Sequence, residues 1–272
     1  MNAIEITGLK KSYSATVEAL KGIDLSIPQG EFFGLLGPNG AGKTTIINSI
    51  VGLVRPNSGS IKVMGHDIRK EPLAAKRYLG LSPQEINIHA YFPIGNVMEF
   101  QGGFYGLSKK ESKQRAEKLL KDFGLWEKRK VGRFKLSGGM QRRLMIARAL
   151  MGKPKILILD EPTAGIDVEL RHELWEFLKG LNSDGTTILL TTHYIEEAEL
   201  LCERVGIIHK GKIVACDSPT KLIEKYRFEN KERKGVLKFV RPGSLEEVFV
   251  NLTGKSLAEG AKEWEVSRDL QL

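Results

Sequence analysis

The sequence is poor in cysteine, with two in 272 residues. Two cysteines, Cys202 and Cys216, are too few for a disulfide framework, and they lack the spacing of a Cys/His metal site. This excludes a disulfide-stabilised protein and a protein built around such a metal site. We expect both thiols to be buried as small apolar groups. No apolar run approaches the roughly 20 residues of a membrane-spanning helix, and the first residues lack the order of a secretory signal. These absences predict a soluble protein that stays in its compartment of synthesis.

Internal repeats and low-complexity tracts are also lacking. With 272 residues, 41% of them hydrophobic, the chain can form one large globular domain with an appendage, or two modest domains. The formal net charge of +9 suits nucleic acid, an anionic membrane surface or phosphorylated ligands. Charge alone does not choose among these three partners.

The hydrophobic pattern alternates strands with helices. The first thirty residues alternate apolar and polar side chains, which predicts an antiparallel β region. Residues 32–36 form a continuous apolar run followed by a glycine-rich turn, and residues 43–53 have helical spacing, so this segment predicts a buried strand, a loop and a helix. Further strand signals lie at residues 60–64, 78–81, 156–159 and 187–190.

Strand signals disappear from about residue 96 to residue 150. Residues 109–123 place apolar side chains on one face and Lys and Arg on the other, which predicts an amphipathic helix. Residues 168–181 also have helical spacing. Toward the C-terminus, helix starts are expected at Ser218 and at Ser244, the latter with a capping box, and the charged residues 227–233 are expected to be exposed.

Residues 37–44 match the P-loop pattern, in which two glycines four residues apart are followed by Lys and Thr. The strand before and the helix after supply the context that the motif requires. Backbone N–H groups and the helix dipole would hold an anion, Lys43 would reach the β- and γ-phosphates, and Thr44 would hold Mg²⁺. The predicted nucleotide-binding residues of this segment are Gly37, Pro38, Asn39, Gly40, Ala41, Gly42, Lys43, Thr44 and Thr45.

Two acids follow the apolar run 156–159, where ligands bind in open parallel sheets. A P-loop enzyme needs a carboxylate on the Mg²⁺ side and a group that activates or orients water. We predict that Asp160 is the metal-side carboxylate and Glu161 the base or water-positioning group. The fold predicted is therefore α/β: a P-loop NTPase core with a parallel sheet, an N-terminal antiparallel β subdomain and an inserted helical subdomain.

Residues 136–141, Leu-Ser-Gly-Gly-Met-Gln, resemble the signature motif of the ATP-binding subunits of ABC transporters. The other marks of the family follow in the expected order, and the resemblance spans roughly residues 3 to 220, which makes a chance match negligible. These marks are Tyr13, Gln84, the segment 164–167 and His193.

The resemblance implies an ATPase that works as a dimer with a second copy of itself or a homologous ATPase subunit. The two copies meet head to tail, so that Ser137 and the amides of Gly138 and Gly139 cover ATP bound to the P-loop of the other copy. The family signature most commonly has Gln where this chain has Met140. Phosphate contact depends on the serine and glycines, so we expect function to survive this change.

The family also implies roles for the other marks. Tyr13 would stack on adenine, and His193 would contact the γ-phosphate and hold the water and Glu161 in place. The amide of Gln84 would reach Mg²⁺ or the attacking water. The resemblance thus implies a domain at residues 1–220, with the helical subdomain inserted at about residues 86–150, and a short C-terminal extension at residues 221–272.

Residues 92–107 and 245–249 resemble the exporter branch of the family, which implies docking on a separate transmembrane permease subunit at the cytoplasmic face of the cell membrane. We expect the docking surface in the loop after Gln84 and in the apolar segment 86–107. One alternative is a soluble ABC ATPase acting on nucleic acid or ribosomes; the short insertion and single P-loop disfavour it, so no nucleic acid is expected. Another is an ATP-binding scaffold without turnover, which Glu161 and His193 disfavour.

Overall fold

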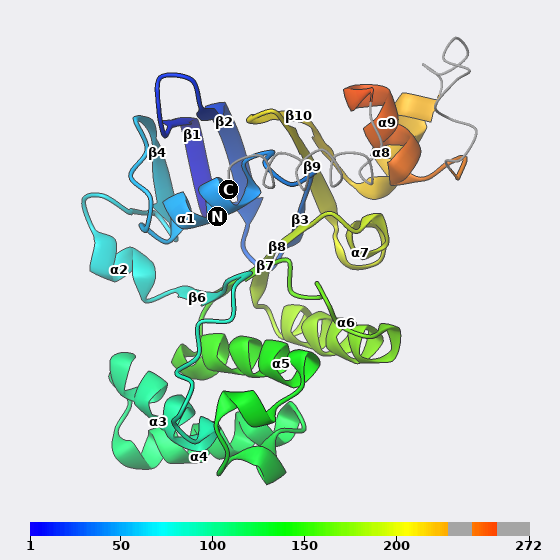
Figure 1. The fold of residues 1–272 in the computed structure, drawn as a ribbon. Coiled ribbons are helices and arrows are strands. Elements are labelled where there is room, and N and C mark those ends of the chain that lie inside the picture. The colour runs from blue at the N-terminus through cyan, green and yellow to red at the C-terminus, as the bar shows by residue number, and fades with distance from the viewer. Residues whose placement is uncertain (228–240, 255–272) are drawn as a thin grey trace.

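The N-terminal region forms an antiparallel sheet, as its alternating pattern predicts. The computed structural model describes residues 1–227 and 241–254, so most of the charged segment 227–233 lies outside the described residues (Figure 1). The sheet has the strand order β2-β1-β4-β5. Its strands are β1 (Asn2–Ser12), β2 (Glu18–Pro28), β4 (Ser58–Val63) and β5 (His66–Asp67).

The second sheet has six strands and positions several of the predicted site residues. Its strand order is β10-β9-β3-β8-β7-β6, and its neighbouring strands are parallel except for the antiparallel pair β9–β10. Because the carboxyl ends of β3, β6, β7 and β8 meet at one edge, the loops that follow them converge. The strands are β3 (Phe32–Leu36), β6 (Leu79–Ser82), β7 (Ile156–Asp160), β8 (Thr187–Thr192), β9 (Arg204–His209) and β10 (Lys212–Asp217).

The central strands separate two hydrophobic cores. In β3, Phe33 and Leu35 pack with the antiparallel sheet and with helix α1 (Lys43–Ile50), whereas Phe32 and Leu36 pack with the helices on the opposite face. The same alternation divides β7, where Ile156 joins the first core and its neighbour Leu157 the second. Successive side chains of a strand point to opposite faces, so a continuous apolar run supplies both cores.

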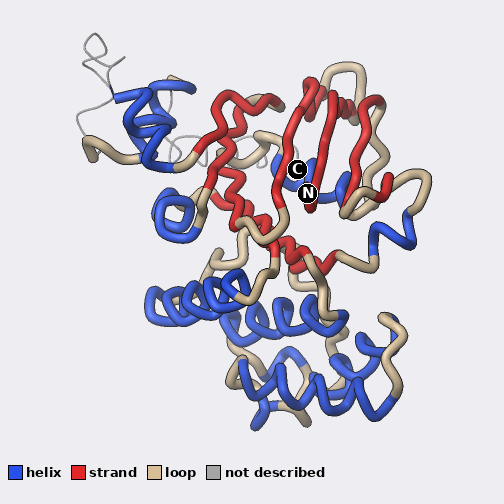
Figure 2. The backbone as a smooth tube through the Cα atoms, turned by 180° about the vertical axis from the view of Figure 1, so that it is seen from behind, coloured by secondary structure: helices blue, strands red, loops and turns tan. Residues whose placement is uncertain are grey.

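The helical subdomain is inserted between β6 and β7, as the loss of strand signals predicts. It forms a separate lobe below the sheets, with α5 between the sheet and the other helices (Figures 1 and 2). Ser108 caps α4 with a complete capping box to Glu111. The helices and short 3₁₀ turns of this region are α3 (Ile94–Phe104), α4 (Lys109–Asp122), η1 (Trp126–Lys128), η2 (Arg133–Lys135), α5 (Gly138–Ala149) and η3 (Leu150–Gly152).

The remaining helices flank the sheets and end the described chain. Ser244 accepts a hydrogen bond from the Glu247 N–H at 3.4 Å, while the Glu247 carboxylate accepts from the Gly243 N–H at 2.7 Å, so the predicted helix start is present with its box offset by one residue. α8 and α9 pack on each other. These helices are α1 (Lys43–Ile50), α2 (Pro72–Lys76), α6 (Val168–Ser183), α7 (Ile195–Leu201), α8 (Pro219–Arg227) and α9 (Leu245–Thr253).

The two cysteines differ in environment, so the prediction that both are buried is wrong for one of them. Cys202 is buried against β3, where a Cβ on Gly34 would lie only 2.6 Å from its sulfur. Burial raises the pKa of this thiol well above its usual value. Cys216 is exposed. It lies on β10, an edge strand of the sheet, and an edge position leaves part of a strand in contact with water.

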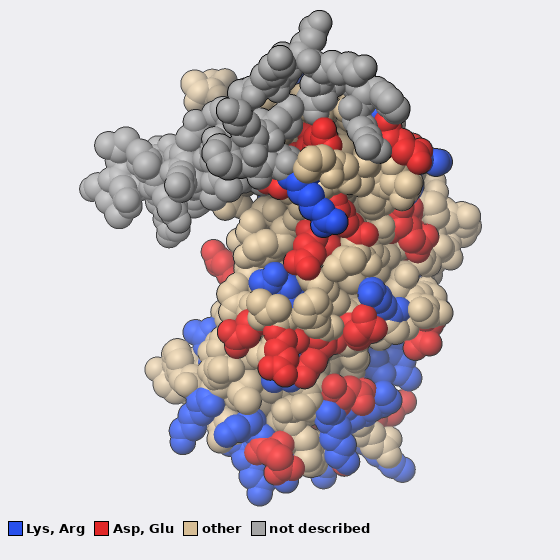
Figure 3. All heavy atoms as spheres, turned by 90° about the vertical axis from the view of Figure 1, so that its right-hand side faces the viewer, with Lys and Arg blue, Asp and Glu red and all other residues tan. Residues whose placement is uncertain are grey.

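Positive charge is concentrated in the helical lobe. Residues 86–150 contain 14 Lys and Arg against five Asp and Glu, a net charge of +9. The rest of the chain contains 28 of each kind, so the whole formal charge of +9 belongs to this segment. Figure 3 shows blue side chains gathered toward the lower end of the molecule, where the helical lobe lies in Figure 1.

Candidate functional site

The turn between β3 and α1 forms a narrow cradle, and steric constraints explain why glycine occupies several of its positions. A Cβ on Gly37 would lie 2.5 Å from the Ile208 carbonyl oxygen, and Gly42 has a φ of 113° with the Ala19 carbonyl 2.9 Å from the position of a Cβ. Gly40 also has a positive φ, of 76°. Side chains at these positions would clash or be strained, so the glycines let the loop turn its N–H groups inward.

Lys43 lies within this loop rather than in solvent. Its ammonium donates to the Gly37 carbonyl at 2.7 Å and to the Pro38 carbonyl at 3.3 Å, and it forms an ion pair with Glu161 at 3.1 Å from Nζ to Oε1. The side chain is only 5% exposed. A buried positive charge at the start of a helix can neutralise a phosphate group.

Asp160, at the end of β7, lies opposite Thr44, at the start of α1. The Thr44 hydroxyl donates to Asp160 Oδ2 at 3.0 Å, and the Thr191 hydroxyl donates to Oδ1 at 2.5 Å. Burial raises the pKa of Asp160, and the hydrogen bonds from Thr191 and Thr44 act in the opposite direction. Mg²⁺ in phosphate sites takes one or two protein oxygens and completes its shell with water and phosphate, so this oxygen pair fits Mg²⁺.

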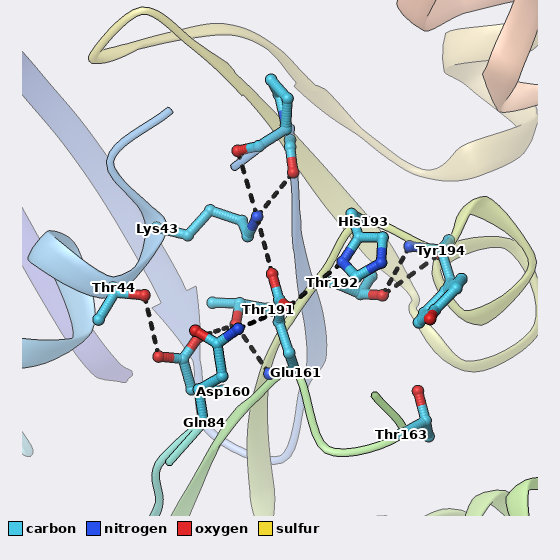
Figure 4. A network of polar contacts seen from close by, with 12 residues as sticks. Lys43, Thr44, Gln84, Asp160, Glu161, Thr163, Thr191, Thr192, His193 and Tyr194 are labelled. Atoms are coloured by element: carbon cyan, nitrogen blue, oxygen red, sulfur yellow. Dashed lines mark hydrogen bonds and ion pairs between the residues drawn. The ribbon is translucent and has the colours of Figure 1, made fainter. Parts of the chain in front are cut away.

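Glu161 is the centre of the polar network in Figure 4. Its φ of 48° is unusual for a residue with a side chain, and its N–H is held by the carbonyl and the hydroxyl of Thr191, both within 3.2 Å. Its Oε2 accepts from Gln84 at 3.1 Å and lies 3.3 Å from His193 Nδ1. The sequence and the family resemblance predict Lys43, Gln84, Glu161 and His193 for one site, and the structure brings these four residues together.

The electrostatics of this group keep Glu161 ionised. Burial alone would raise its pKa, but the contact with His193 and the charge of Lys43 lower it to about 2. The carboxylate is therefore charged at neutral pH while these contacts exist. A carboxylate in this state can orient a water molecule, and it gains basicity when the Lys43 charge is shared with another anion.

A pocket opens above the P-loop and is lined mainly by the predicted residues. Its walls include Thr45, Gln84 and Glu161, with Ala19 from β2 on one side. Tyr13 follows β1 and is 57% exposed, with its hydroxyl 3.4 Å from the Thr45 hydroxyl. The P-loop residues in the lining are Pro38, Asn39, Gly40, Gly42, Lys43, Thr44 and Thr45.

The signature segment does not line this pocket. Ser137 is exposed and caps α5 by accepting a hydrogen bond from the Met140 N–H at 3.2 Å, and Gly138 is exposed beside it. Met140, which departs from the common family signature, is partly buried against the core of the helical lobe. Ser137 and Gly138 are thus exposed to solvent, while Met140 packs against the core of the helical lobe.

Arg142, two residues after Met140, was not predicted from the sequence as a site residue. The residue is 6% exposed, and its guanidinium donates to the carbonyls of Pro83 at 2.9 Å and Gln84 at 2.8 Å. α5 is thereby fastened directly to the backbone of the residue that contacts Glu161. The signal in the sequence is weak, since an arginine on a helix is usually solvated.

Comparison with known proteins identifies the family of this chain. A family profile described as "ABC transporter" matches residues 20–164. The linearmycin resistance ATP-binding protein LnrL of Bacillus subtilis is 45% identical over 219 residues, which are 80% of this chain and 70% of that protein. The Nod factor export ATP-binding protein I of Rhizobium sp. (strain N33) is 34% identical and covers 94% of this chain, with 98% of its own length matched.

Solved structures show the same fold. The dimeric post-hydrolysis state of an ATP-binding cassette bound to ADP and Pi superposes with a TM-score of 0.74 at 29% identity, covering 79% of this chain and 98% of that one. The P-loop NTPase fold with its antiparallel and helical additions is therefore confirmed. The chain belongs to the ABC transporter family, of which it is an ATP-binding and ATP-hydrolysing subunit.

Proposed function

We propose that the chain powers export through a separate permease subunit by closing as a dimer around two ATP molecules. The observation that carries this proposal is the convergence of Lys43, Gln84 and His193 on Glu161 beside the Asp160–Thr44 oxygen pair. In it, Lys43 binds phosphate, Asp160 and Thr44 hold Mg²⁺, and Glu161 directs water. Gln84 and His193 keep that carboxylate in place.

The exposed signature residues support the dimer. Ser137 and the first residues of α5 do not line the pocket of their own chain, and Ser137 is exposed, so they are available to phosphate held by a second copy. A similar solved structure is described as dimeric. We propose that Ser137, Gly138 and Gly139 complete the site of the partner copy, which is this chain again or a homologous ATPase.

Tyr13 is proposed to stack on adenine. Base–aromatic stacking contributes about 1–3 kcal/mol and tolerates any base, so Tyr13→Ala should weaken ATP and GTP binding alike, while Tyr13→Trp has little effect. Tyr13→Phe is the matched control, because it keeps the ring and removes only the hydroxyl near Thr45. Fluorescence titration of nucleotide measures all three. An alanine variant with the parent affinity would mean that Tyr13 only covers the β region.

Export and the membrane partner rest on the relatives. A relative is described as a Nod factor export ATP-binding protein and another as a linearmycin resistance ATP-binding protein. Within residues 1–227 and 241–254, no helix is both long and apolar enough to cross a membrane. We propose peripheral attachment to the cytoplasmic face of the membrane through a multi-spanning subunit. Purification from detergent-solubilised membranes should recover that subunit, and recovery of ribosomes or nucleic acid instead would contradict the proposal.

The predicted docking segment 86–107 divides into two groups of side chains. Ile88, Ile94 and Met98 are at most 4% exposed and fill the core of the helical lobe. The exposed group lies partly along α3, next to a pocket formed by α3, α5 and the residues around β6 and α1. The exposed aromatic residues are Tyr91 (84%), Phe92 (46%), Phe100 (62%), Phe104 (85%) and Tyr105 (36%). We propose that this exposed group contacts the permease.

A charge placed in each group should have different effects. Phe104→Glu should reduce recovery of the membrane complex about tenfold or more, because contact with apolar partner surface is lost, while basal ATPase activity and Tm stay at parent values. Leu200→Glu, at an exposed apolar residue of α7, is the matched control and should retain the complex. Met98→Glu should lower Tm, since it buries a charge. Intact complex in the Phe104 variant would place the docking surface elsewhere.

A further inference from the structure

Glu197 of α7 is a fully buried carboxylate that lies outside the nucleotide pocket. It is 0% exposed, yet no lysine, arginine or histidine forms an ion pair with it among the described residues. Instead three neutral donors converge on it. Trp175 Nε1 donates to Oε1 at 3.3 Å, Thr192 Oγ1 donates to Oε2 at 2.5 Å, and the Thr163 hydroxyl makes a short hydrogen bond to Oε1. A buried carboxylate without a counter-charge needs such donors.

The first hydroxyl, that of Thr192, clamps the residue that follows it. While donating to Glu197, the Thr192 oxygen accepts the Tyr194 N–H at 2.9 Å. Thr192 and Tyr194 are the residues before and after His193. Hydrogen bonds therefore connect the backbone on both sides of the histidine to Glu197. In Figure 4, dashed lines join the Thr192 hydroxyl to Tyr194 beside His193. The position of His193 Nδ1, 3.3 Å from Glu161, therefore depends on the hydrogen bond between Thr192 and Glu197.

The second hydroxyl, that of Thr163, stands two residues after Glu161. Glu161 has left-handed backbone geometry, and such a conformation persists only where the surroundings hold it. Thr191 holds the N–H of Glu161, and the Glu161 carbonyl accepts the Ala164 N–H at 3.3 Å. Thr163 lies inside this turn and is 1% exposed. Its bond to Glu197 attaches the turn at a second point, in addition to the contact of Glu161 with Thr191.

We infer that Glu197 is a positioning residue for ATP hydrolysis, which holds the Glu161 turn and His193 in register through Thr163 and Thr192. Its two oxygens bind the loops after β7 and β8 to one point on α7. The acceptor groups of a carboxylate suit three donors, whereas an amide presents one oxygen and an NH₂ group that a hydroxyl must turn to face. This inference rests on the proposed roles of Glu161 and His193.

The test is Glu197→Gln in the full chain, assayed well below its Tm. We expect kcat to fall about 10- to 100-fold, because a small misplacement of reacting groups slows the reaction strongly. KM and ATP affinity should stay within about twofold of the parent values, since the P-loop is unchanged. Thr192→Val breaks only the link through Thr192, so its loss should be no larger than that of Glu197→Gln, and the double variant should lose little more than Glu197→Gln alone. Glu196→Gln, the same change at the exposed neighbour, is the matched control.

Three results would overturn the inference. Parent kcat in Glu197→Gln at unchanged Tm is one, and additive losses in the double variant are another. The third is a lower Tm with parent kcat per folded molecule, which would give Glu197 a purely structural role. Failure of the proposed function has a different signature, because it appears as turnover in Glu161→Gln regardless of the residue at position 197.

Discussion

Glu161→Gln is expected to stop ATP turnover while ATP still binds. The amide keeps the size of the side chain and the contact with Gln84, but it cannot accept a proton or draw a water molecule as a carboxylate does. Loss of a general base costs about 100- to 10,000-fold in kcat. The amide also removes the negative partner of Lys43, which leaves that cation free to pair with phosphate. ATP affinity should therefore equal or exceed that of the parent.

The same variant should accumulate as an ATP-bound dimer, because closure occurs and hydrolysis does not reopen it. Size-exclusion chromatography with and without Mg²⁺-ATP measures this, together with steady-state phosphate release. Glu224→Gln, which changes an exposed carboxylate on α8, is the control and should turn over and elute like the parent. Phosphate release by Glu161→Gln at the parent rate would show that another group activates water.

Lys43→Ala acts at an earlier step, since it should weaken ATP binding itself. The ammonium is buried among two loop carbonyls and one carboxylate, so its removal deletes the charge that faces the phosphates. Hydrogen bonds to charged groups contribute about 1.5–3 kcal/mol, which predicts a loss in ATP affinity of about 10- to 100-fold. Calorimetry with unlabelled ATP measures this affinity directly.

The change at Lys43 has a second, electrostatic result. With its cation gone, the pKa of Glu161 should rise from about 2 toward its usual range, because burial then opposes only the contact with His193. The stability that the ionised carboxylate contributes is present above the unfolded-state pKa and is lost as pH falls through the folded-state value, so the Lys43→Ala protein should lose stability at a higher pH than the parent. Parent ATP affinity in this variant would exclude the proposed phosphate role.

The nucleotide site was predictable because its residues follow strands of one parallel sheet. Lys43, Asp160 and His193 each come after an apolar run, and the carboxyl ends of parallel strands share an edge. Their proximity therefore follows from the strand pattern once the P-loop fixes the fold. The roles of Tyr13, Gln84, Ser137 and His193 were found through the family resemblance. Gln84 and His193 follow strands of that sheet, whereas Tyr13 and Ser137 do not.

Other features depend on tertiary packing that no local pattern encodes. The segment 86–107 is apolar throughout, and only the structure separates buried Met98 from exposed Phe104, since both occur on one helix. The sequence predicts a solvated Arg142 on a helix, whereas in the structure its guanidinium donates to the Gln84 carbonyl. Glu197 gives no sequence signal either, because its three donors lie 5, 22 and 34 positions away.

The placement of all net charge in the helical lobe makes the molecule an electric dipole. Residues 86–150 carry +9 at one end of the particle, and the remainder is neutral (Figure 3). Near a negatively charged surface such a particle experiences a torque that turns its positive end toward that surface before any contact forms. The fraction of encounters with the lobe leading should fall as salt shortens the Debye length, which is about 8 Å at physiological ionic strength. Orientation thus becomes a property of the approach as well as of the bound state.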